Sequence, residues 1–388
     1  MNRVCSIFSQ IMQMIPRKEF QAAVNEHKAE RHARGFSSWT QFISMMFCQL
    51  GHAQSLREIT GGLASCEGKL KHLGVDEAPK RSTLSYANEH RPWQVYETVF
   101  HQLLKRCQGE ASAKKRKFRF KHKLLSLDSS VIPLCLSVFD WAHYKRTKGA
   151  VKLHMVLDHD GYLPSFAVIT AGKTGDITVA KKMRFEPGTM VVFDRGYSDY
   201  GWWLSLTRQK VTFVTRLKDD ADYGVVESRG VLKGSNIVRD EVILLCAQQE
   251  AGPEARLRRI EVWVEEKQET MVFLTNHLKL AASTIAAVYK DRWAVELFFK
   301  AIKQGLKIKT FVGTSENAVR TQIWTALIAM LMVKFLQLRS TFGWSLSNLI
   351  ALLRQQLFVY RDLFTWLNNP YQAPPPIDDA QMSLSLGV

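Results

Sequence analysis

Apolar residues recur at helical spacing through the first 110 residues of the chain, and no stretch of that region alternates as a strand does. The clearest run comprises Trp39, Phe42, Ile43, Met46, Phe47 and Leu50. Ser37 or Ser38 precedes this run, where a hydroxyl can accept from a backbone N–H of the first turn. The pattern predicts a helical N-terminal region.

A second predicted helix in this region begins at Ser82, after Lys80 and Arg81. Two helices of this kind are compatible with a helix-turn-helix reader of DNA, although the segment between them is longer than in the compact motif. The side chains that would face DNA are Ser82, Thr83, Ser85 and Asn88. Ordinary packing of the two helices is the alternative.

From residue 124 the pattern changes to short apolar runs, which are typical of buried strands. A run at 124–128 ends in Asp128, and a run at 190–193 is followed by Asp194. Two further runs, 151–158 and 163–170, are joined by the turn sequence Asp-His-Asp-Gly. With helices at about 176–183 and 198–208 and a strand at 211–215, this order predicts an α/β domain with a mixed sheet.

Strand-like runs separated by turns continue from about residue 219 to residue 276, and the clearest are 242–246, 260–264 and 271–274. This segment is predicted to be a β-rich insert. A long helix is expected at about 281–303, followed by helices at about 318–339 and 345–360. The tail contains Pro374, Pro375 and Pro376 and is expected to be disordered.

The helix expected at 281–303 carries the most informative pattern. With Tyr289 at 0° and about 100° per residue, Arg292, Glu296 and Lys303 fall at about −60°, −20° and −40°. These four polar side chains therefore share one narrow stripe of the helix. For Arg292, an ion pair with Glu296 one turn away is the alternative to a functional role. The opposite face, predicted to pack on the sheet, comprises Ala294, Leu297, Phe298, Ala301 and Ile302.

The spacing Tyr289-x2-Arg292-x3-Glu296-x6-Lys303 resembles the Tyr–Arg–Glu–Lys signature of the IS-four family of bacterial insertion-sequence transposases, and all the intervals match. The segments Phe-Asp-Arg-Gly-Tyr at 193–197 and Phe-Val-Gly-Thr-Ser-Glu-Asn at 311–317 are also similar to that family. The resemblance is strongest over residues 120–340. The N-terminal part is similar to the helical domain that many such transposases carry.

The resemblance implies a ribonuclease-H-like α/β fold, in which a β-rich insert interrupts the mixed sheet before the last catalytic helix. The order of elements expected from the pattern agrees with this fold. The expected domains are a helical DNA-binding domain at 1–112, a basic linker at 113–123, a catalytic domain at 124–310 with the insert at about 219–276, and a helical C-terminal region with a disordered tail at 311–388.

The family motif assigns three metal-binding catalytic carboxylates to Asp128, Asp194 and Glu296. Asp140 is the nearest rival of Asp128, but it does not end an apolar run. Asp194 also fits a residue that starts a turn or caps the next helix. Three carboxylates suit two Mg²⁺ ions, which prefer oxygen ligands and promote in-line attack on phosphorus. Mn²⁺ is the expected substitute.

Tyr289, Arg292 and Lys303 are expected to hold the phosphates beside the scissile one. Trp263 in the β-rich insert is a further candidate DNA contact, because hairpin-forming transposases of this family flip a base onto an aromatic residue there. Burial in the core is the alternative for this tryptophan.

His154 alternates with Lys152 along one strand, and their shared face is expected to look toward the active site. His154 itself is expected to be a structural histidine. Asp176, in a Thr-Gly-Asp sequence, is expected to cap a helix rather than bind a metal.

The net charge of +17 and the isoelectric point near 9.6 favour a polyanionic partner such as nucleic acid. The densest charge lies at 114–123, where seven of ten residues are Lys or Arg. This segment is expected to lie on DNA phosphates, with a solvated linker as the alternative. Its named DNA-binding candidates are Lys114, Lys115, Arg116, Lys117 and Arg119. The six cysteines show no metal-binding or disulfide spacing, which fits a reducing cytosol.

These features predict a DNA transposase that binds terminal inverted repeats, cleaves the element ends and transfers the 3′ strands to target DNA. Its expected partner is double-stranded DNA, and the resemblance implies a second copy of the chain in a synaptic homodimer. No small-molecule substrate is expected. No membrane association is expected either, because the longest apolar run, 323–333, is too short to span a bilayer. The expected location is the bacterial cytoplasm, at the nucleoid. The alternatives are a DNA-binding regulator of the same fold without catalysis and another ribonuclease-H-like nuclease.

Overall fold

The N-terminal region is helical in the computed structural model, which describes residues 5–372 apart from residues 32, 34, 67, 113–116, 119, 121, 146–147 and 309, and only the backbone of 143–145, 148 and 248–251. Ser37 caps α3, since its hydroxyl accepts from the Thr40 N–H at 3.1 Å. The helical prediction and the predicted cap are therefore confirmed. The elements are α1 (Ile7–Met12), α2 (Arg17–Glu26), α3 (Ser38–Leu50), α4 (Leu56–Ala64), η1 (Leu70–Leu73), α5 (Arg81–His90) and α6 (Gln94–Ser112).

The centre of the molecule is a mixed sheet in which five strands run in the order β4-β3-β1-β5-β6. Strand β3 is antiparallel to both β1 and β4, whereas β5 runs parallel to both β1 and β6. This order and these directions are the ribonuclease-H-like arrangement, so the predicted fold class is confirmed. The strands are β1 (Leu124–Leu134), β2 (His143–Lys145), β3 (Lys148–Asp158), β4 (Leu163–Ala171), β5 (Met190–Val192) and β6 (Thr212–Arg216).

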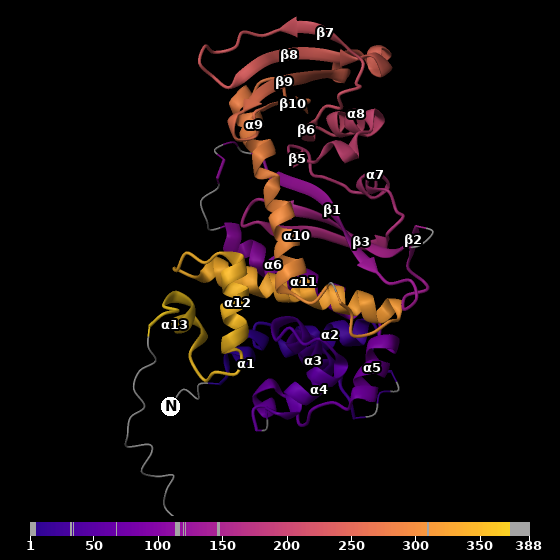
Figure 1. The fold of residues 1–388 in the computed structure, drawn as a ribbon, viewed down its shortest axis with the longest axis vertical. Helices are drawn as coiled ribbons and strands as arrows, with labels where there is room; N and C mark the ends of the chain where they lie inside the picture. The colour runs from indigo at the N-terminus through magenta and orange to yellow at the C-terminus, as the bar shows by residue number, and fades with distance from the viewer. Residues whose placement is uncertain are drawn as a thin grey trace, which may run out of the picture.

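The predicted β-rich insert is present, and it extends the central sheet. Strand β10 pairs with β6 in antiparallel register, with Phe273 opposite Arg216, and β9, β8 and β7 follow in order. Figure 1 shows these strands stacked at the end of the molecule farthest from the N-terminal helices. Their bounds are β7 (Tyr223–Ser228), β8 (Ile237–Leu245), β9 (Arg256–Val264) and β10 (Glu269–Thr275), with 3-10 helices η3 (Cys246–Ala255) and η4 (Glu265–Lys267).

The two faces of the central sheet are covered by different helices. Leu125 and Leu127 pack in one core with α7 (Asp176–Ala180) and α8 (Tyr200–Arg208). Leu124 lies in a different core with Val288 of α9 (Ala282–Asp291). Since successive side chains of a strand point to opposite faces, Asp128 points to the face covered by α9 and α10 (Trp293–Gly305).

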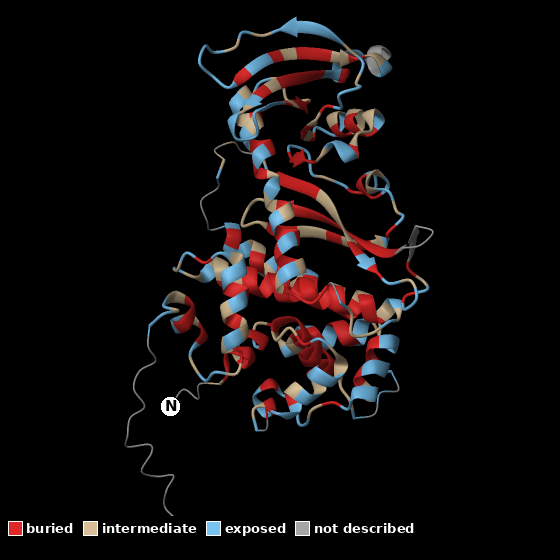
Figure 2. Cartoon of the chain, in the orientation of Figure 1, coloured by how far each residue is buried: buried red, intermediate tan, exposed pale blue. Residues whose placement is uncertain are grey.

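Helices from both ends of the chain share one hydrophobic core, which runs from Ile7 to Leu367. At its centre lies α11 (Glu316–Arg339), which packs against α3, α5 and α6 and also contacts β4. This helix is long and apolar enough to cross a membrane, but 89% of its apolar window is buried inside the protein (Figure 2). The helix expected at about 318–339 is therefore present, and it is a buried core helix. The C-terminal helices α12 (Leu346–Gln356) and α13 (Leu363–Asn368) complete this core.

Three expectations about local structure are wrong. Strand β1 continues to Leu134 because its ladder with β3 extends that far, so Asp128 lies within the strand instead of at its end. The single helix expected at 281–303 is divided into α9 and α10 at Arg292. Leu297 is 51% exposed, because the buried face of α10 is formed by Val295, Phe298, Phe299, Ala301 and Ile302.

The domain division expected from the sequence stays a prediction, but the shared core restricts how it can be tested. Removing residues 1–110 would uncover the apolar surface of α11, which α3, α5 and α6 cover. The proline-containing tail at 374–376 lies outside the described residues.

We predict that Leu327→Ala, in the middle of α11, lowers the free energy of unfolding by about 3 kcal/mol, because Leu327 is fully buried and the substitution leaves a cavity. The measurement is the midpoint of urea unfolding, monitored by circular dichroism. The matched control is Leu232→Ala, which removes the same atoms from a side chain that is 84% exposed. Equal losses in the two variants would contradict the central position of α11.

Candidate active site

Parallel pairing of β1 with β5 brings Asp128 and Asp194 to the same level of the sheet. The paired residues are Leu124 with Met190 and Ser126 with Val192. Two residues beyond the last pair, the strands reach Asp128 and Asp194. Asp128 follows the alternation of β1 and points to the face that α9 and α10 cover, and the charge of Asp194 acts on it from the turn after β5.

Asp194 sits in the sharp turn that follows β5. Its Oδ1 accepts from the Gly196 N–H at 2.9 Å, and it caps the short 3-10 helix η2 (Arg195–Tyr197). The turn-starting role considered for Asp194 is therefore real, and it fixes the direction of the carboxylate. A Cβ on Gly196 would lie 2.9 Å from the same Oδ1, so any larger residue at 196 would displace the carboxylate.

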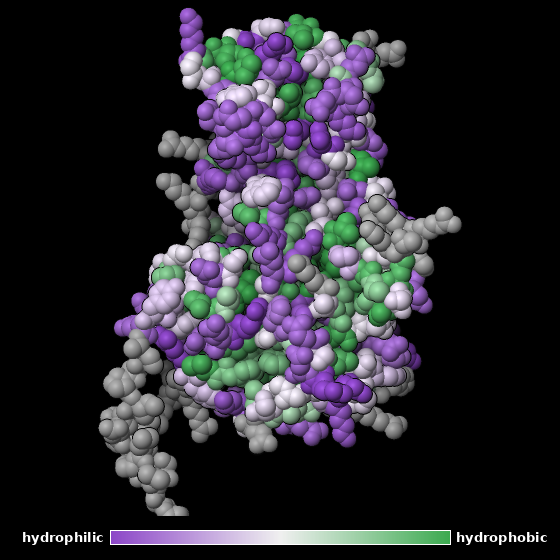
Figure 3. Space-filling view, viewed as in Figure 1, coloured by the Kyte–Doolittle hydropathy of each residue, from purple (hydrophilic) through white to green (hydrophobic). Residues whose placement is uncertain are grey.

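Glu296 reaches this region from the first turn of α10. A cavity of about 430 Å³ lies between α10 and β1. In the view of Figure 3, hydrophilic side chains cover much of the β-rich end and continue along the face that α10 crosses. The cavity is lined by Asp128, Ser129, Ser130, Glu296, Phe299, Lys300, Lys303 and Gln304. The structure therefore brings Asp128, Glu296 and Lys303 together, as the sequence predicts.

Arg292 lies at the break between α9 and α10 and connects the two acids. Its guanidinium is 2.6 Å from Glu296 Oε1 and 3.6 Å from Asp128 Oδ2. The side chain is only 12% exposed, so these charges interact with little screening by water. The i,i+4 ion pair considered for Arg292 is present, but the contact with Asp128 joins that pair to the sheet.

The carboxyl of Asp128 has a perturbed pKa. Its pKa is raised to about 6, mainly by burial and also by the negative charges of Asp194 and Glu296, while the Ser129 N–H and Arg292 oppose the shift. Asp194 and Glu296 therefore lie close enough for their charges to act on Asp128.

Tyr289 and Lys303 approach this cluster from its two ends. Tyr289 is 7% exposed, its ring packs 4.8 Å from that of Phe273, and the Arg292 guanidinium carbon lies 5.5 Å from its ring centre. Burial is also the main cause that raises the pKa of the Tyr289 hydroxyl. Lys303 donates to the carbonyl of Val131 on β1 at 3.1 Å. The four signature residues thus line one side of α9–α10.

Arg216 belongs to this site although the sequence analysis missed it. Strand β6 pairs with β5 so that Val214 lies beside Val192, and Arg216 follows two residues later, at the level of Asp194. Its Nε is buried and has no hydrogen-bond partner among the described residues. The signal was available, because the run at 211–215 ends in Arg216 as the run at 190–193 ends in Asp194.

His154 and Lys152 lie on the opposite face of the sheet from Asp128, contrary to expectation. His154 pairs with Ser129, whereas Asp128 pairs with Met155, so the alternation separates them. His154 Nε2 lies 2.9 Å from the Thr170 hydroxyl, and burial lowers the pKa of its imidazole to about 4, which fits a neutral structural histidine.

Asp176 was expected to cap a helix, but it does not cap α7, because Gly175 occupies the cap position of that helix. Its carboxylate instead accepts from the Ser129 hydroxyl at 2.6 Å and from Lys152 at 3.2 Å. Asp176 therefore contacts β1 on the sheet face opposite to Asp128.

The donor set of the site fits a divalent metal ion in its chemistry. Asp128, Asp194 and Glu296 supply only oxygen ligands, which Mg²⁺ and Mn²⁺ prefer. In the described part of the chain, however, no group of three His, Cys, Asp or Glu residues lies close enough to hold a metal. Arg292 lies between two of the acids, in the region that a shared cation would occupy.

The other candidate DNA contacts are less defined. Lys114, Lys115, Arg116 and Arg119 lie outside the described residues. Lys117 is described and forms an ion pair with Asp291. Trp263 on β9 is 37% exposed, so it is not the core residue considered as an alternative.

Two family models match the chain. A transposase DDE domain matches residues 119–332, which include all three acids, and a domain of unknown function named DUF4372 matches residues 4–76. The first match covers more than half of the chain. The protein therefore belongs to the DDE transposases, and its class is that of a DNA-processing enzyme.

Known relatives agree with this assignment. The chain is 31% identical over 305 residues to y4zB of Sinorhizobium fredii, which is named as a transposase, covering 78% of this chain and 82% of the relative. It is 28% identical over 257 residues to a protein of Geobacillus stearothermophilus named as a transposase for insertion sequence element IS5377, covering 66% and 67% of the two chains.

A solved piggyBac transposase synaptic complex with hairpin DNA aligns over 98% of this chain and 83% of that chain. The TM-score is 0.43 at 11% identity, a likeness too weak to support an argument. The family is thus established by sequence, whereas membership of the IS-four group stays a prediction.

We predict that Asp128→Asn stabilises the metal-free protein at pH 7 by about 1–2 kcal/mol. The pKa of this carboxyl is about 6 in the folded protein against 3.8 for an ordinary aspartate, so the folded state binds the proton more tightly. Stability is therefore lost as the pH rises from about 4 to above 6, and the amide, which cannot ionise, avoids this loss.

The measurement is urea unfolding of both proteins with a chelator present, at pH 4 and pH 7. The gain from the substitution should be present at pH 7 and absent at pH 4. Asp219→Asn, at a side chain that is 89% exposed, is the matched control and should change stability at neither pH. If the wild type is more stable than Asp128→Asn at pH 7, the raised pKa of Asp128 is refuted.

Proposed function

We propose that this transposase cleaves DNA at the ends of its own element and joins the freed 3′ strands to target DNA at the site formed by Asp128, Asp194 and Glu296. The observation that carries the proposal is the convergence of the three acids. Two lie at the same level of neighbouring parallel strands, and the third reaches them from α10 through Arg292.

The three acids are the groups that would hold Mg²⁺ or Mn²⁺ beside the scissile phosphate. When bound, such ions activate the attacking oxygen and stabilise the leaving oxygen. The raised pKa of Asp128 supports this role, because burial and the charges of Asp194 and Glu296 disfavour its ionised form, which a bound cation would stabilise. For a cation to bind between Asp128 and Glu296, Arg292 would have to release at least one of these two carboxylates.

Arg292 would then be available to bind DNA. A guanidinium can hold a phosphate through two N–H donors, which suits the phosphate next to the reacting one. Lys303 and Lys300 line the same cavity, and Arg216 lies on the other side of Asp194. These cations would surround the negative charge of the substrate and of the transition state.

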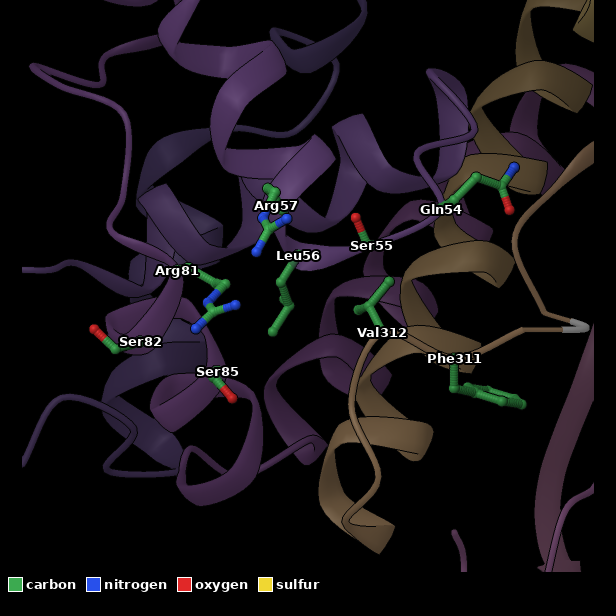
Figure 4. Close-up of a pocket in the computed structure, with 9 residues that line it drawn as sticks. All are labelled: Gln54, Ser55, Leu56, Arg57, Arg81, Ser82, Ser85, Phe311 and Val312. Atoms are coloured by element: carbon green, nitrogen blue, oxygen red, sulfur yellow. The ribbon is translucent and has the colours of Figure 1, made fainter.

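A second cationic surface lies on the N-terminal helices. A cavity of about 520 Å³ lies between the beginnings of α4 and α5 (Figure 4). The exposed side chains of Arg57 and Arg81 extend toward the same space, and neither forms an ion pair with a described carboxylate. The N-terminal ends of helices and two guanidinium groups together favour phosphate. The lining residues are Gln54, Ser55, Leu56, Arg57, Arg81, Ser82, Ser85, Phe311 and Val312.

This surface refines the helix-turn-helix prediction. Ser82 and Ser85 line the cavity and are exposed, as a reader of DNA requires. Asn88 is only 2% exposed and accepts from Gln41 Nε2 at 2.9 Å, so its predicted contact with DNA is wrong. We infer that this surface contributes to binding the terminal inverted repeats.

The remaining parts of the proposal rest on the family resemblance. A synaptic homodimer would hold two element ends together. The partly exposed indole of Trp263 would stack on a base, because among the described side chains its Nε1 reaches only Glu265, at 3.2 Å. A catalytically inactive regulator of the same fold is the second candidate, and the presence of all three acids argues against it.

We predict that Glu296→Gln lowers the rate of end cleavage and strand transfer by about 100-fold or more, because the neutral amide cannot help hold the cation. Labelled element-end DNA is incubated with wild type or variant in Mg²⁺, and the products are separated on denaturing gels.

The matched control is Glu316→Gln, which removes the acid of another i,i+4 pair, Glu316 with Arg320, on a different helix. The control variant should cut and join DNA as the wild type does. Equal activity of wild type and Glu296→Gln would refute the catalytic assignment, and a wild type that binds the ends without ever cutting them would favour the regulator.

We predict that the double variant Arg57→Gln, Arg81→Gln weakens binding of element-end DNA and lowers the slope of log K against log salt by about 2, since two phosphate contacts are lost. The measurement is fluorescence anisotropy at several salt concentrations. Lys182→Gln, Arg184→Gln removes the same charge from exposed positions beside α7 and is the control. An equal slope of log K against log salt in both double variants would show that DNA binding depends on net charge and not on the positions of Arg57 and Arg81.

A further inference from the structure

A buried network of polar side chains joins the end of α9 to β1. Asp291, the last residue of α9, is 9% exposed. His159 Nδ1 lies 2.6 Å from Asp291 Oδ2, and His159 Nε2 lies 2.6 Å from the Ser126 hydroxyl. The Tyr162 hydroxyl donates to both oxygens of Asp291 at 3.3 and 3.1 Å, and Lys117 forms an ion pair with Oδ1.

The chemistry of the groups fixes the direction of these hydrogen bonds. An ionised carboxylate can only accept, so His159 Nδ1–H donates to Asp291. In a neutral ring Nε2 then accepts from the Ser126 hydroxyl. Burial by itself would raise the pKa of Asp291, but the hydrogen bonds from His159 and Lys117 outweigh it and lower the pKa to about 2. Asp291 is therefore ionised at neutral pH.

The serine–histidine–aspartate order is that of a hydrolase, but the burial of Ser126 excludes such a reaction. Ser126 is fully buried within β1. The cavity beside His159 measures about 20 Å³, which is room for about one water and not for a substrate. A nucleophile must reach its substrate, so the network has a different role.

The network is adjacent in sequence to the candidate active site at both of its ends. Ser126 is two residues before Asp128 on the same strand face. Asp291 immediately precedes Arg292, which contacts both Asp128 and Glu296. Figure 1 shows α9 and α10 following one another across the sheet, so the position of their junction determines where Glu296 meets β1.

We propose that Ser126, His159 and Asp291, together with Tyr162 and Lys117, position the α9–α10 junction against β1 and so hold Arg292 and Glu296 at Asp128. These are positioning residues, since the site touches substrate through other side chains. The proposal rests on the proposed function for its catalytic consequence. Its structural consequence, an ordered junction, is independent of that function.

The physical reason is that a helix end that no side chain holds in place can shift relative to the sheet. Helix α9 breaks at Arg292, where the backbone hydrogen bonding changes register, and no side chain caps the start of α10. The network supplies an ionised acceptor with three donors in place of a cap. A misplacement of about 1 Å of a catalytic group can lower a rate by about 100-fold.

The test compares Asp291→Asn, Ser126→Ala and their double variant with the wild type. The control Asp240→Asn breaks a buried carboxylate pair of similar exposure, Asp240 with Arg258 at 2.6 Å, in the β-rich insert. Three quantities are measured: amide hydrogen exchange of residues 288–296, the affinity for element-end DNA without divalent metal, and the single-turnover cleavage rate with Mg²⁺.

We expect Asp291→Asn to speed exchange at 288–296 at least tenfold and to lower the cleavage rate about 100-fold, with DNA affinity within threefold of the wild type. Ser126→Ala should lower the rate about tenfold. The double variant should be no slower than Asp291→Asn alone, because residues that act as one unit are not additive. Asp240→Asn should change neither exchange at 288–296 nor the rate.

Exchange at 288–296 that is unchanged in both single variants would overturn the proposal, as would rate losses in the double variant that multiply. An equal loss of rate in Asp240→Asn would show general destabilisation and would also overturn it. If Asp291→Asn does not fold, Ser126→Ala decides by the same criteria. A wild type that never cleaves DNA would refute the proposed function, and the exchange data would still decide whether the network orders the junction.

Discussion

The parallel pairing of β1 with β5 is the constraint on which the rest of the structure depends. It sets Ser126 beside Val192 and therefore places Asp128 and Asp194 at the same level of the sheet. A shift of one residue would turn one acid to the opposite face, because side chains alternate along a strand. The other parts of the site, Arg216 on β6 and Arg292 and Glu296 at α10, are placed relative to these two acids.

In the protein without metal or DNA, the positive charge of Arg292 partly neutralises the acids of the site. Three acids lie near one another, and Arg292 connects two of them. In the proposed function, Arg292 would hold Asp128 and Glu296 until metal and DNA bind. The buried network around Asp291 then explains how Arg292 keeps this position, although it lies where a helix is broken.

Much of the fold and of the site could be predicted from the sequence, because the signals involved are local. The run ending in Asp194 and the spacing of Tyr289, Arg292, Glu296 and Lys303 each depend on a short segment. The helix break at Arg292 and the exposure of Leu297 could not be predicted, because a uniform helical wheel does not show where tertiary contacts bury a face.

Residues that act through distant partners were missed. Asp291 and His159 are 132 positions apart, and neither stands out in a local pattern. His154 was assigned to the wrong face because alternation gives the two faces of a strand but not which helices cover each face. Lys114, Lys115, Arg116 and Arg119 lie outside the described part of the chain, so their contact with DNA stays a prediction.

The central claim is that Asp128, Asp194 and Glu296 form one metal site on DNA. The most direct measurement replaces Mg²⁺ with Fe²⁺ in the complex with element-end DNA, and maps the chain breaks that peroxide then produces near the bound ion. The account predicts three groups of breaks, around residues 128, 194 and 296, that disappear in Glu296→Gln. Breaks elsewhere in the chain, or the same breaks in that variant, would contradict it.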